Sequence, residues 1–506
     1  MPELPLQYSQ DSTHMSWREY HELTKHSVES LRRTQHYLDW ANMPNPFRHY
    51  EGVPVLDLPA DPPVPQISAL AVLEGKTGIT LARDGAEFLS QLMFYSASIS
   101  AYKRVSSTGA VYSLRVNPSS GNLHPTEFHF CAQGLVGWPD GLYHYRPSSH
   151  MVEQRAIGDW GGKLIGTSAP LIFILTSVAW REAWKYRDRA YRYCLHDVGH
   201  AWQALTLAAR SIGCESFAFG QFPDDRVAEQ CLLNEDEWPM LIVELQGPSI
   251  PVRPLEPVET ILFRGQPNRL SEEQVAYPLI ERIHAATKLT VQTAAPVLAQ
   301  AKPSGRGEIS LSPNSSTSRS FGDVVRARRS ALDFRGGEES ISLSQLATLL
   351  TAAQGRLFAD FATAPVVQLY LYVHRVDGLK RGLYRYWPEH AELERIKEGD
   401  QRLAAASLSL GQELAGNACV AVSMIGDFEN ASLSYGNRGY RYVHFEAGAI
   451  GQRMYLAAEA LGLRATGIGA FFDEQVNRYL NLSPELGQVV YHFAIGYPVS
   501  DPRLEG

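Results

Sequence analysis

Two short clusters of polar residues, far apart in the chain, could together bind an anionic ligand that carries a flat ring. The first, residues 118–122, reads Pro-Ser-Ser-Gly-Asn and offers backbone amides, hydroxyl groups, a side-chain amide and a glycine that permits close approach. The second combines Arg326, Arg328, Arg329 and Ser330, a set that can make charge-assisted hydrogen bonds to a phosphate. Each cluster alone is also typical of a plain turn or an exposed helix start. Together they predict a site for a phosphate at one end and a polar-edged ring at the other.

The two clusters fall in different copies of an internal repeat. Residues 185–222 align with residues 434–472 at one constant offset, and the matched positions are mainly Tyr, Arg and Gly. The matches include Tyr186 with Tyr435, Arg189 with Arg438, Tyr191 with Tyr440, Arg192 with Arg441, Gly199 with Gly448 and Phe222 with Phe471. The first copy lacks the arginine cluster and the second lacks the Pro-Ser-Ser-Gly-Asn turn. We therefore expect one composite site between the two copies.

Both copies contain the same order of elements. Each has an alternating apolar run, a hairpin built on Gly-Leu-Tyr-x-Tyr, a buried strand, a long helix of small and apolar residues, and a last strand. This order predicts an α+β fold of two tandem domains, each an antiparallel-rich sheet flanked by helices, that form an intramolecular pseudo-dimer. The expected boundaries are an N-terminal extension over 1–64, domains over 65–250 and 317–506, and a connector over 251–316 with a helix and a flexible stretch.

The composition narrows the class of partner. The net charge is -8, from 46 Lys plus Arg against 54 Asp plus Glu, without a block of like charges. This balance argues against nucleic acid or an anionic membrane surface. The five cysteines contain no Cys-x-x-Cys pair, and no window approaches 18 uninterrupted apolar residues. We expect a protein of the cytoplasm without a membrane span or a disulfide framework.

With the repeat, the two clusters resemble the FMN-dependent nitroreductase family, in which two α+β subunits share flavin sites at their interface. The resemblance implies FMN as the cofactor. It places Arg328, Arg329 and Ser330 at the flavin phosphate, and the 118–122 turn along the isoalloxazine ring. It further assigns cofactor contacts to Pro118, Ser119, Ser120, Asn122, Gly467, Ile468, Gly469 and Ala470, and to Arg503 near the phosphate.

The first copy is similar to one branch of this family, the SagB-type dehydrogenases, which oxidise azolines to azoles in modified peptides. The stretch from Arg115, Arg-Val-Asn-Pro-Ser-Ser-Gly-Asn, and the run Trp-Lys-Tyr-Arg-Asp-Arg carry this likeness, so Arg115 joins the predicted cofactor contacts. The branch implies Lys185 and Tyr186 as the catalytic pair. The second copy has Ser434 before its matching tyrosine. We therefore expect one complete flavin site and one decayed one.

Three functions remain open from the sequence. The first is an FMN-dependent dehydrogenase that oxidises an azoline or a similar C–N bond in a peptide or small natural product, with Lys185 as base if Arg187 and Arg189 lower its pKa, and Tyr186 assisting. The second is a nitro- or quinone-reductase-like enzyme that uses NAD(P)H. The third is a flavin-binding protein without turnover. A purely structural role for Tyr186 is an alternative, because the tyrosine recurs in the second copy.

Two other kinds of site are disfavoured. His196 and His200, four residues apart on an expected helix, could face one zinc ion. The strict His-Glu-x-x-His pattern is absent, no third ligand is apparent, and the second copy has Phe445 and Ala449 at these positions. A nicotinamide-binding fold is disfavoured because no Gly-x-Gly-x-x-Gly follows a strand.

Overall fold

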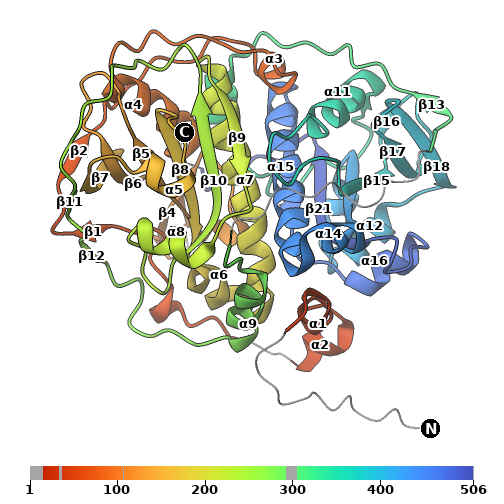
Figure 1. Ribbon diagram of the computed structural model, residues 1–506. Helices are drawn as coiled ribbons and strands as arrows, with labels where there is room; N and C mark the ends of the chain where they lie inside the picture. The colour runs from red at the N-terminus through yellow and green to blue at the C-terminus, as the bar shows by residue number, and fades with distance from the viewer. Residues whose placement is uncertain (1–14, 34–36, 106–107, 292–304, 505–506) are drawn as a thin grey trace.

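The computed structural model describes residues 15–33, 37–105, 108–291 and 305–504. It contains two antiparallel sheets of matching strand order, one in each half of the chain (Figure 1). The first has the order β11-β7-β6-β5-β8-β10-β9, and the second the order β13-β18-β17-β15-β19-β21-β20. The first sheet comprises β5 (Thr126–Ala132), β6 (Gly141–Arg146), β7 (Met151–Ile157), β8 (Leu171–Ser177), β9 (Glu215–Phe219), β10 (Trp238–Gln246) and β11 (Ile261–Leu262). The second comprises β13 (Ile309–Ser310), β15 (Val367–Val373), β17 (Gly382–Trp387), β18 (Glu392–Glu398), β19 (Val420–Gly426), β20 (Arg464–Ile468) and β21 (Gln488–Gly496). The predicted tandem α+β fold is confirmed.

Two long helices join the halves. Helix α7 (Ala190–Ser211) packs against α15 (Gly439–Ala460) through the middle of the molecule (Figure 1). The helices cross at a glycine pair from the repeat. A Cβ on Gly199 would lie 2.3 Å from a backbone oxygen of α15, and a Cβ on Gly448 would lie 2.2 Å from a backbone oxygen of α7. Only glycine allows backbones this close, and hydrophobic residues of both halves merge into one core around the crossing.

Reciprocal ion pairs also bind the halves together. Two arginines at the start of each long helix reach a buried aspartate of the opposite half. The pairs are Arg189 and Arg192 with Asp473, and Arg438 and Arg441 with Asp224, at 2.5–3.0 Å. Burial opposes ionisation of Asp224, but Arg441 and Arg438 outweigh it and hold the pKa of this carboxyl below its usual value. Removing one partner would leave a buried charge unpaired, so these residues fix how the halves meet.

The extension contributes an edge strand to the first sheet, and the connector contributes one to each sheet. Strand β2 (Val55–Asp57) of the extension pairs with β7, as does β11 of the connector, while β13 of the connector pairs with β18. These short strands cover edges that would otherwise expose unpaired backbone groups. The expected connector helix is α9 (Pro278–Thr287). The expected flexible stretch falls largely on residues 292–304, outside the described residues.

Shorter helices pack around the sheets and against the two long helices. In the first half these are α3 (Ala69–Leu73), α4 (Gly85–Ser96), α5 (Gly161–Ile165), α6 (Ala179–Tyr186) and α8 (Asp224–Gln230). In the second they are α10 (Phe321–Ala327), α11 (Leu343–Ala353), α12 (Arg402–Leu408), α13 (Leu414–Asn417), α14 (Phe428–Tyr435) and α16 (Asp473–Tyr479). The extension also begins on the second half, because Trp17 of α1 (Trp17–Leu23) stacks on Phe428 with ring centroids 5.2 Å apart.

One element breaks the likeness between the halves. A hairpin of β3 (Ile99–Arg104) and β4 (Val111–Arg115) stands between α4 and β5. The sequence analysis did not predict it, because its residues are mixed and half-exposed. Between α11 and β15 the second half has a shorter segment in which the structure assigns no strand. The hairpin therefore belongs to the half that carries the Pro-Ser-Ser-Gly-Asn turn.

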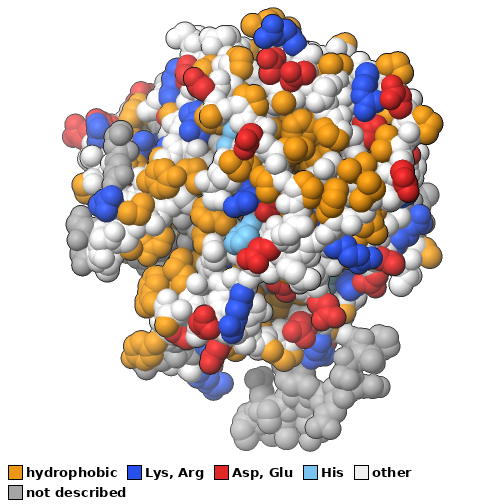
Figure 2. All heavy atoms as spheres, turned by 90° about the vertical axis from the view of Figure 1, so that its left-hand side faces the viewer, with side chains coloured by type: hydrophobic (Ala, Val, Ile, Leu, Met, Phe, Trp, Pro, Cys, Tyr) orange, Lys and Arg blue, Asp and Glu red, His pale blue; other side chains and the backbone are white. Residues whose placement is uncertain are grey.

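The outer surface carries charges of both signs. Figure 2 shows basic and acidic side chains interspersed with hydrophobic ones over the face of the first half. Within the described residues, no helix has both the length and the apolar character needed to cross a bilayer.

Candidate active site

A cavity of about 610 Å³ lies between the two halves and brings together nearly all predicted site residues. From the first half it is lined by Arg115, Pro118, Ser119, Ser120, Asn122, Lys185 and Tyr186. From the second half it is lined by Arg328, Arg329, Ser330, Gly467, Ile468, Gly469, Ala470 and Arg503. Its volume lies in the range of small-molecule and cofactor sites. The two clusters that the sequence placed in one composite site therefore face the same cavity.

The Pro-Ser-Ser-Gly-Asn turn is held by a buried carboxylate of α7. Ser119 Oγ donates to Asp197 at 2.5 Å, and the backbone N–H and Oγ of Ser120 donate to the same carboxylate at 3.1 and 2.9 Å. Gly121 and Asn122 then take left-handed backbone conformations, with φ of 59° and 61°. The turn is thus fixed by three hydrogen bonds and a glycine, which keeps its polar groups at the cavity wall.

Sequence reasoning missed Asp197. Its counterpart in the repeat, Glu446, does a similar job in the second half, because its carboxylate accepts the amides of Val366 and Val367 at 2.8–2.9 Å. The sign of this role in the sequence is an acid at the same register of both long helices. Between His196 and His200, however, the acid indicates only a departure from the zinc-binding pattern.

The titration of Asp197 gives a testable pH dependence. Burial raises the pKa of Asp197 from 3.8 to about 7, against the hydrogen bonds from Ser119 and Ser120. The folded state holds this proton more tightly than the unfolded state. The stabilisation that the proton gives to the folded state is therefore complete at low pH and is lost as pH rises through about 7. We expect the wild-type free energy of unfolding, relative to Asp197→Asn, to fall by roughly 2–3 kcal/mol between about pH 5 and 8. Denaturant titrations of both proteins across this range measure it, and a pH-independent difference would contradict the assignment.

The second half contributes two arginines without an acidic partner. Arg328 Nε donates to the carbonyl of Val116 at 3.0 Å, and Arg329 Nη2 donates to the carbonyl of Ser100 at 2.9 Å. Neither guanidinium forms an ion pair with a carboxylate among the described residues. Burial, followed by the nearby arginines, lowers the pKa of Arg329 to about 10. Two neighbouring, unneutralised cations in a cavity wall suit a dianionic phosphate.

Two other predicted arginines lie differently. Arg326 does not line the cavity. Its Nη1 donates to Ser98 Oγ at 2.9 Å and to the carbonyl of Ile99 at 2.7 Å, so it anchors the base of the β3–β4 hairpin. Arg503 does line the cavity, but its guanidinium forms a two-pronged pair with Asp501 at 2.7 and 2.8 Å. Its charge is already matched.

Strand β20 and the following residues form a wall that requires glycine. A Cβ on Gly467 would lie 2.3 Å from the hydroxyl of Tyr491, and a Cβ on Gly469 would lie 2.3 Å from the ring of Tyr193. The amide of Gly467 donates to Tyr455 at 2.8 Å. The glycines thus let three tyrosines, none of them singled out by the sequence analysis, pack beside the cavity.

The Lys185–Tyr186 pair closes the first-half side of the cavity at the end of α6. A Cβ built on Gly121 would lie 2.7 Å from the Tyr186 hydroxyl and 3.2 Å from Lys185 Nζ, so both groups touch the turn. Burial, and then the nearby carboxyl of Glu182, raises the pKa of Tyr186. Arg189, a neighbour of the lysine in sequence, forms an ion pair with Asp473 at 3.0 Å.

Buried donors in the cavity remain available for a ligand. Arg115 is 1% exposed, and its Nη2 donates to the carbonyl of Pro46 at 2.6 Å. Its Nε and Nη1 find no partner among the described residues. An unpartnered buried guanidinium is costly, and the carbonyl edge of a flat heterocycle would satisfy it. With the arginine pair, this donor set fits a flavin mononucleotide.

The symmetry-related position is filled by protein. The segment between α11 and β15 occupies it, with the carboxylate of Asp360 accepting the amide of Gly220 at 2.7 Å. The ring of Phe361 stacks on Tyr442 with a centroid distance of 4.3 Å. Tyr442 is the counterpart of Tyr193, which lines the cavity in the other position. The chain thus has one open site and one filled by its own side chains.

The two histidines considered for zinc face aromatic groups. The ring of His196 stacks on Tyr491 at 4.3 Å, and His200 Nε2 lies 3.2 Å from the Tyr491 hydroxyl. Within the described residues, no cluster of three or more potential ligands for a metal ion is found. His200 lines the cavity, as a histidine at the edge of a cofactor site would.

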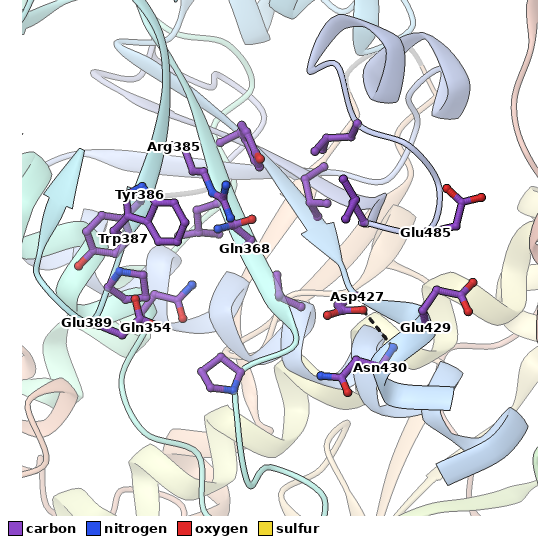
Figure 3. A pocket seen from close by; sticks show the side chains of 18 of the residues that line it. Gln354, Gln368, Arg385, Tyr386, Trp387, Glu389, Asp427, Glu429, Asn430 and Glu485 are labelled. Carbon is purple, nitrogen blue, oxygen red and sulfur yellow. Dashed lines mark hydrogen bonds between the residues drawn. The ribbon is translucent and has the colours of Figure 1, made fainter. Parts of the chain in front are cut away.

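A second cavity, of about 350 Å³, opens on the second sheet and contains none of the predicted site residues (Figure 3). Arg385 and Gln368 line it from neighbouring strands, and Asp427 and Glu429 line it from the start of α14. In the first half the matching sheet face is covered by the extension. There the backbone amide of Tyr50 donates to Glu153, and its hydroxyl donates to Glu237. The 350 Å³ cavity therefore lies apart from the predicted site residues.

Fold and site together define a class. The chain belongs to the nitroreductase family, which it matches over residues 105–245 and 325–497. Members of this family are typically flavin-dependent oxidoreductases. The tandem form of the family expected from the sequence is thereby confirmed.

Particular relatives refine this assignment. The chain is 31% identical over 167 residues to a Methanocaldococcus jannaschii protein named as a nitroreductase, covering 32% of this chain and 83% of that protein. It is 29% identical over 146 residues to the microcin B17-processing protein McbC of Escherichia coli, covering 26% of this chain and 54% of McbC. A solved protein of Anabaena variabilis, also named as a nitroreductase, shares the fold with a TM-score of 0.75 and 26% identity, over 96% of this chain and 100% of that one. The match to McbC agrees with the SagB-type branch.

Proposed function

We propose that this chain is an FMN-dependent dehydrogenase that oxidises an azoline-type ring, or a similar C–N bond, in a peptide or other natural product. The observation that carries the proposal is that one cavity holds both the Lys185–Tyr186 pair and the unneutralised pair Arg328 and Arg329. The first pair can serve proton chemistry and the second can hold a phosphate. The likeness to McbC favours an azoline over other substrates.

The residues divide into those that hold the cofactor and those that serve the substrate. Arg328, Arg329 and Ser330 would bind the phosphate, while the 118–122 turn and Arg115 would meet the ring edge. Bound FMN would supply the acceptor for the hydride that leaves the substrate carbon. The azoline must also lose one proton to become aromatic. Lys185 would take this proton, and the hydroxyl of Tyr186 would orient the lysine.

One FMN per chain is part of the proposal. The second position is closed by the stacked pair Phe361 and Tyr442 and by the bond of Asp360 to Gly220. A flavin there would have to displace buried aromatic surface and leave a carboxylate without its backbone donor.

A reductase that takes electrons from NAD(P)H is the second candidate, favoured by two relatives that are named as nitroreductases. Anaerobic mixing separates the candidates. We expect 2-methylthiazoline-4-carboxamide to bleach the flavin absorbance of the holoprotein within seconds to minutes and to yield the thiazole. Bleaching by NADPH but not by the thiazoline would favour the reductase, and inertness to both would leave a flavin-binding protein without turnover.

A further inference from the structure

A groove lined only by uncharged side chains opens beside the active-site cavity. It encloses about 430 Å³, and Asn122 lines both spaces. Its walls are Met43, Pro44, Asn45, Pro46, Phe47, Ile99, Tyr102, Val111, Tyr112, Ser113, Asn122 and Ser148. Tyr102 and Val111 are 48% and 47% exposed, which is unusual for large apolar side chains that face one shared depression. The groove therefore presents apolar surface that leads to the catalytic groups.

Both walls are held from behind by arginines. On the extension, Arg115 donates to the carbonyl of Pro46 at 2.6 Å and lies over the ring of Phe47, and Arg181 donates to the carbonyl of Asn45 at 3.0 Å. On the hairpin, Arg326 and Arg329 fix the base of β3, as described above. The groove is thus preformed, and binding in it would not have to order its walls.

One wall also offers a strand edge. Strand β4 pairs only with β3 among the described residues. Val111, Tyr112 and Ser113 of β4 line the groove, and one acceptor of this edge, the carbonyl of Ser113, already takes a hydrogen bond from the side-chain amide of Asn122 at 3.0 Å. The far side of β3 is met by the end of the chain, since the amide of Arg104 donates to the carbonyl of Arg503 at 2.8 Å. A free edge beside apolar pockets is how extended peptides are recognised.

Within the described residues, the elements that build the groove belong to the half that carries the Pro-Ser-Ser-Gly-Asn turn. The hairpin has no strand counterpart between α11 and β15, where the shorter segment fills the mirror position. The wall formed by residues 43–47 comes from the extension, which lies outside the repeat. Elements added to one half, and only beside its open site, point to a role in that site's reaction and not in the fold shared by both halves.

We propose that this groove binds the peptide that flanks the reacting ring, as an extended, uncharged segment with aromatic or aliphatic side chains laid along β4. This proposal rests on the proposed function and specifies its substrate as a peptide. Charged flanking residues would be disfavoured inside the groove, because its lining residues are uncharged and would desolvate them. A small free heterocycle would reach the flavin cavity without using the groove.

Three thiazoline probes test this proposal. The first is the bare 2-methylthiazoline-4-carboxamide. The other two carry the same ring with a Phe-Val-Phe or a Glu-Val-Glu segment on each side. Anaerobic flavin bleaching by the holoprotein gives an apparent Kd for each. We expect the Phe-Val-Phe probe to bind at least about tenfold tighter than the bare ring, from an added buried aromatic side chain. Tyr102→Glu and Val111→Glu should abolish that gain and leave the bare ring and the flavin content unchanged. Leu403→Glu, at an 82% exposed position of α12, is the matched control.

The outcomes separate the groove from the chemistry. Equal affinity for the bare and extended rings, or groove variants that weaken all probes alike, would overturn the peptide groove while leaving the oxidation intact. If no probe bleaches the flavin, the proposed function fails instead. Fluorescence anisotropy of a labelled Phe-Val-Phe amide on holoprotein, with and without Tyr102→Glu, then still decides whether the groove binds peptide.

Discussion

Replacing Lys185 with alanine will slow substrate oxidation by about 100-fold or more while the protein keeps its flavin. The lysine is the group best placed to take the substrate proton, and positioned general bases contribute factors of about 10²–10⁴. Its ammonium lies over the Tyr186 ring at 5.2 Å on the first-half side of the cavity, whereas the phosphate-side arginines come from the second half. Cofactor binding should therefore survive. Single-turnover bleaching with the thiazoline, beside the flavin content of each preparation, measures both effects.

Two matched variants show whether the lysine acts as a base. Lys185→Arg keeps a positive charge but cannot lose its proton near neutrality, so it should be as slow as Lys185→Ala. Ser434→Ala, at the same position of the second half, should be unaffected. If Lys185→Arg oxidises the substrate at the wild-type rate, position 185 needs only a positive charge and does not act as a base. The pH profile of that variant's activity would then lack the limb that a titrating lysine produces.

Removing the arginine pair will release the cofactor. Each charge-assisted hydrogen bond contributes about 1.5–3 kcal/mol, so Arg328→Ala with Arg329→Ala should weaken FMN binding by at least about 100-fold. We expect a colourless purified protein and a flavin Kd that rises accordingly in fluorescence titrations. Arg326→Ala is the control, because its guanidinium lies outside the cavity and bonds to Ser98 and Ile99.

Riboflavin separates phosphate recognition from damage to the fold. Arg328 also bonds to the carbonyls of Val116 and Arg115, so its loss affects more than the ligand. If the arginines recognise the phosphate, the double variant will lose its preference for FMN over riboflavin but still bind riboflavin as the wild type does. Equal loss of both ligands would assign the arginines to structure alone.

Much of this site follows from residue types that the sequence shows directly. The serines and the glycine of the 118–122 turn and the Arg-Arg-Ser run predicted two half-sites, and the repeat predicted that they meet. Arg326 does not line the cavity, because it lies at the end of α10 and its guanidinium bonds to Ser98 and Ile99. The residue pattern alone does not show which arginines of this segment reach the cavity.

Other features depend on contacts between distant segments. Asp197 was overlooked because an acid on a buried helix face shows its use only when Ser119 and Ser120 come within bonding distance. The fate of the second site was inferred from missing residues. The structure adds the physical cause, because Phe361 fills the space, and nothing in the sequence around it indicated where its ring would lie.

The central claim is a single flavin bound between two like halves, and the flavin content of the native protein tests it most directly. Protein purified with excess FMN, then freed of unbound ligand, should show one FMN per chain by absorbance after denaturation, and Phe361→Ala should not raise this to two without further changes. Two flavins per native chain, or none at saturating FMN, would contradict the account.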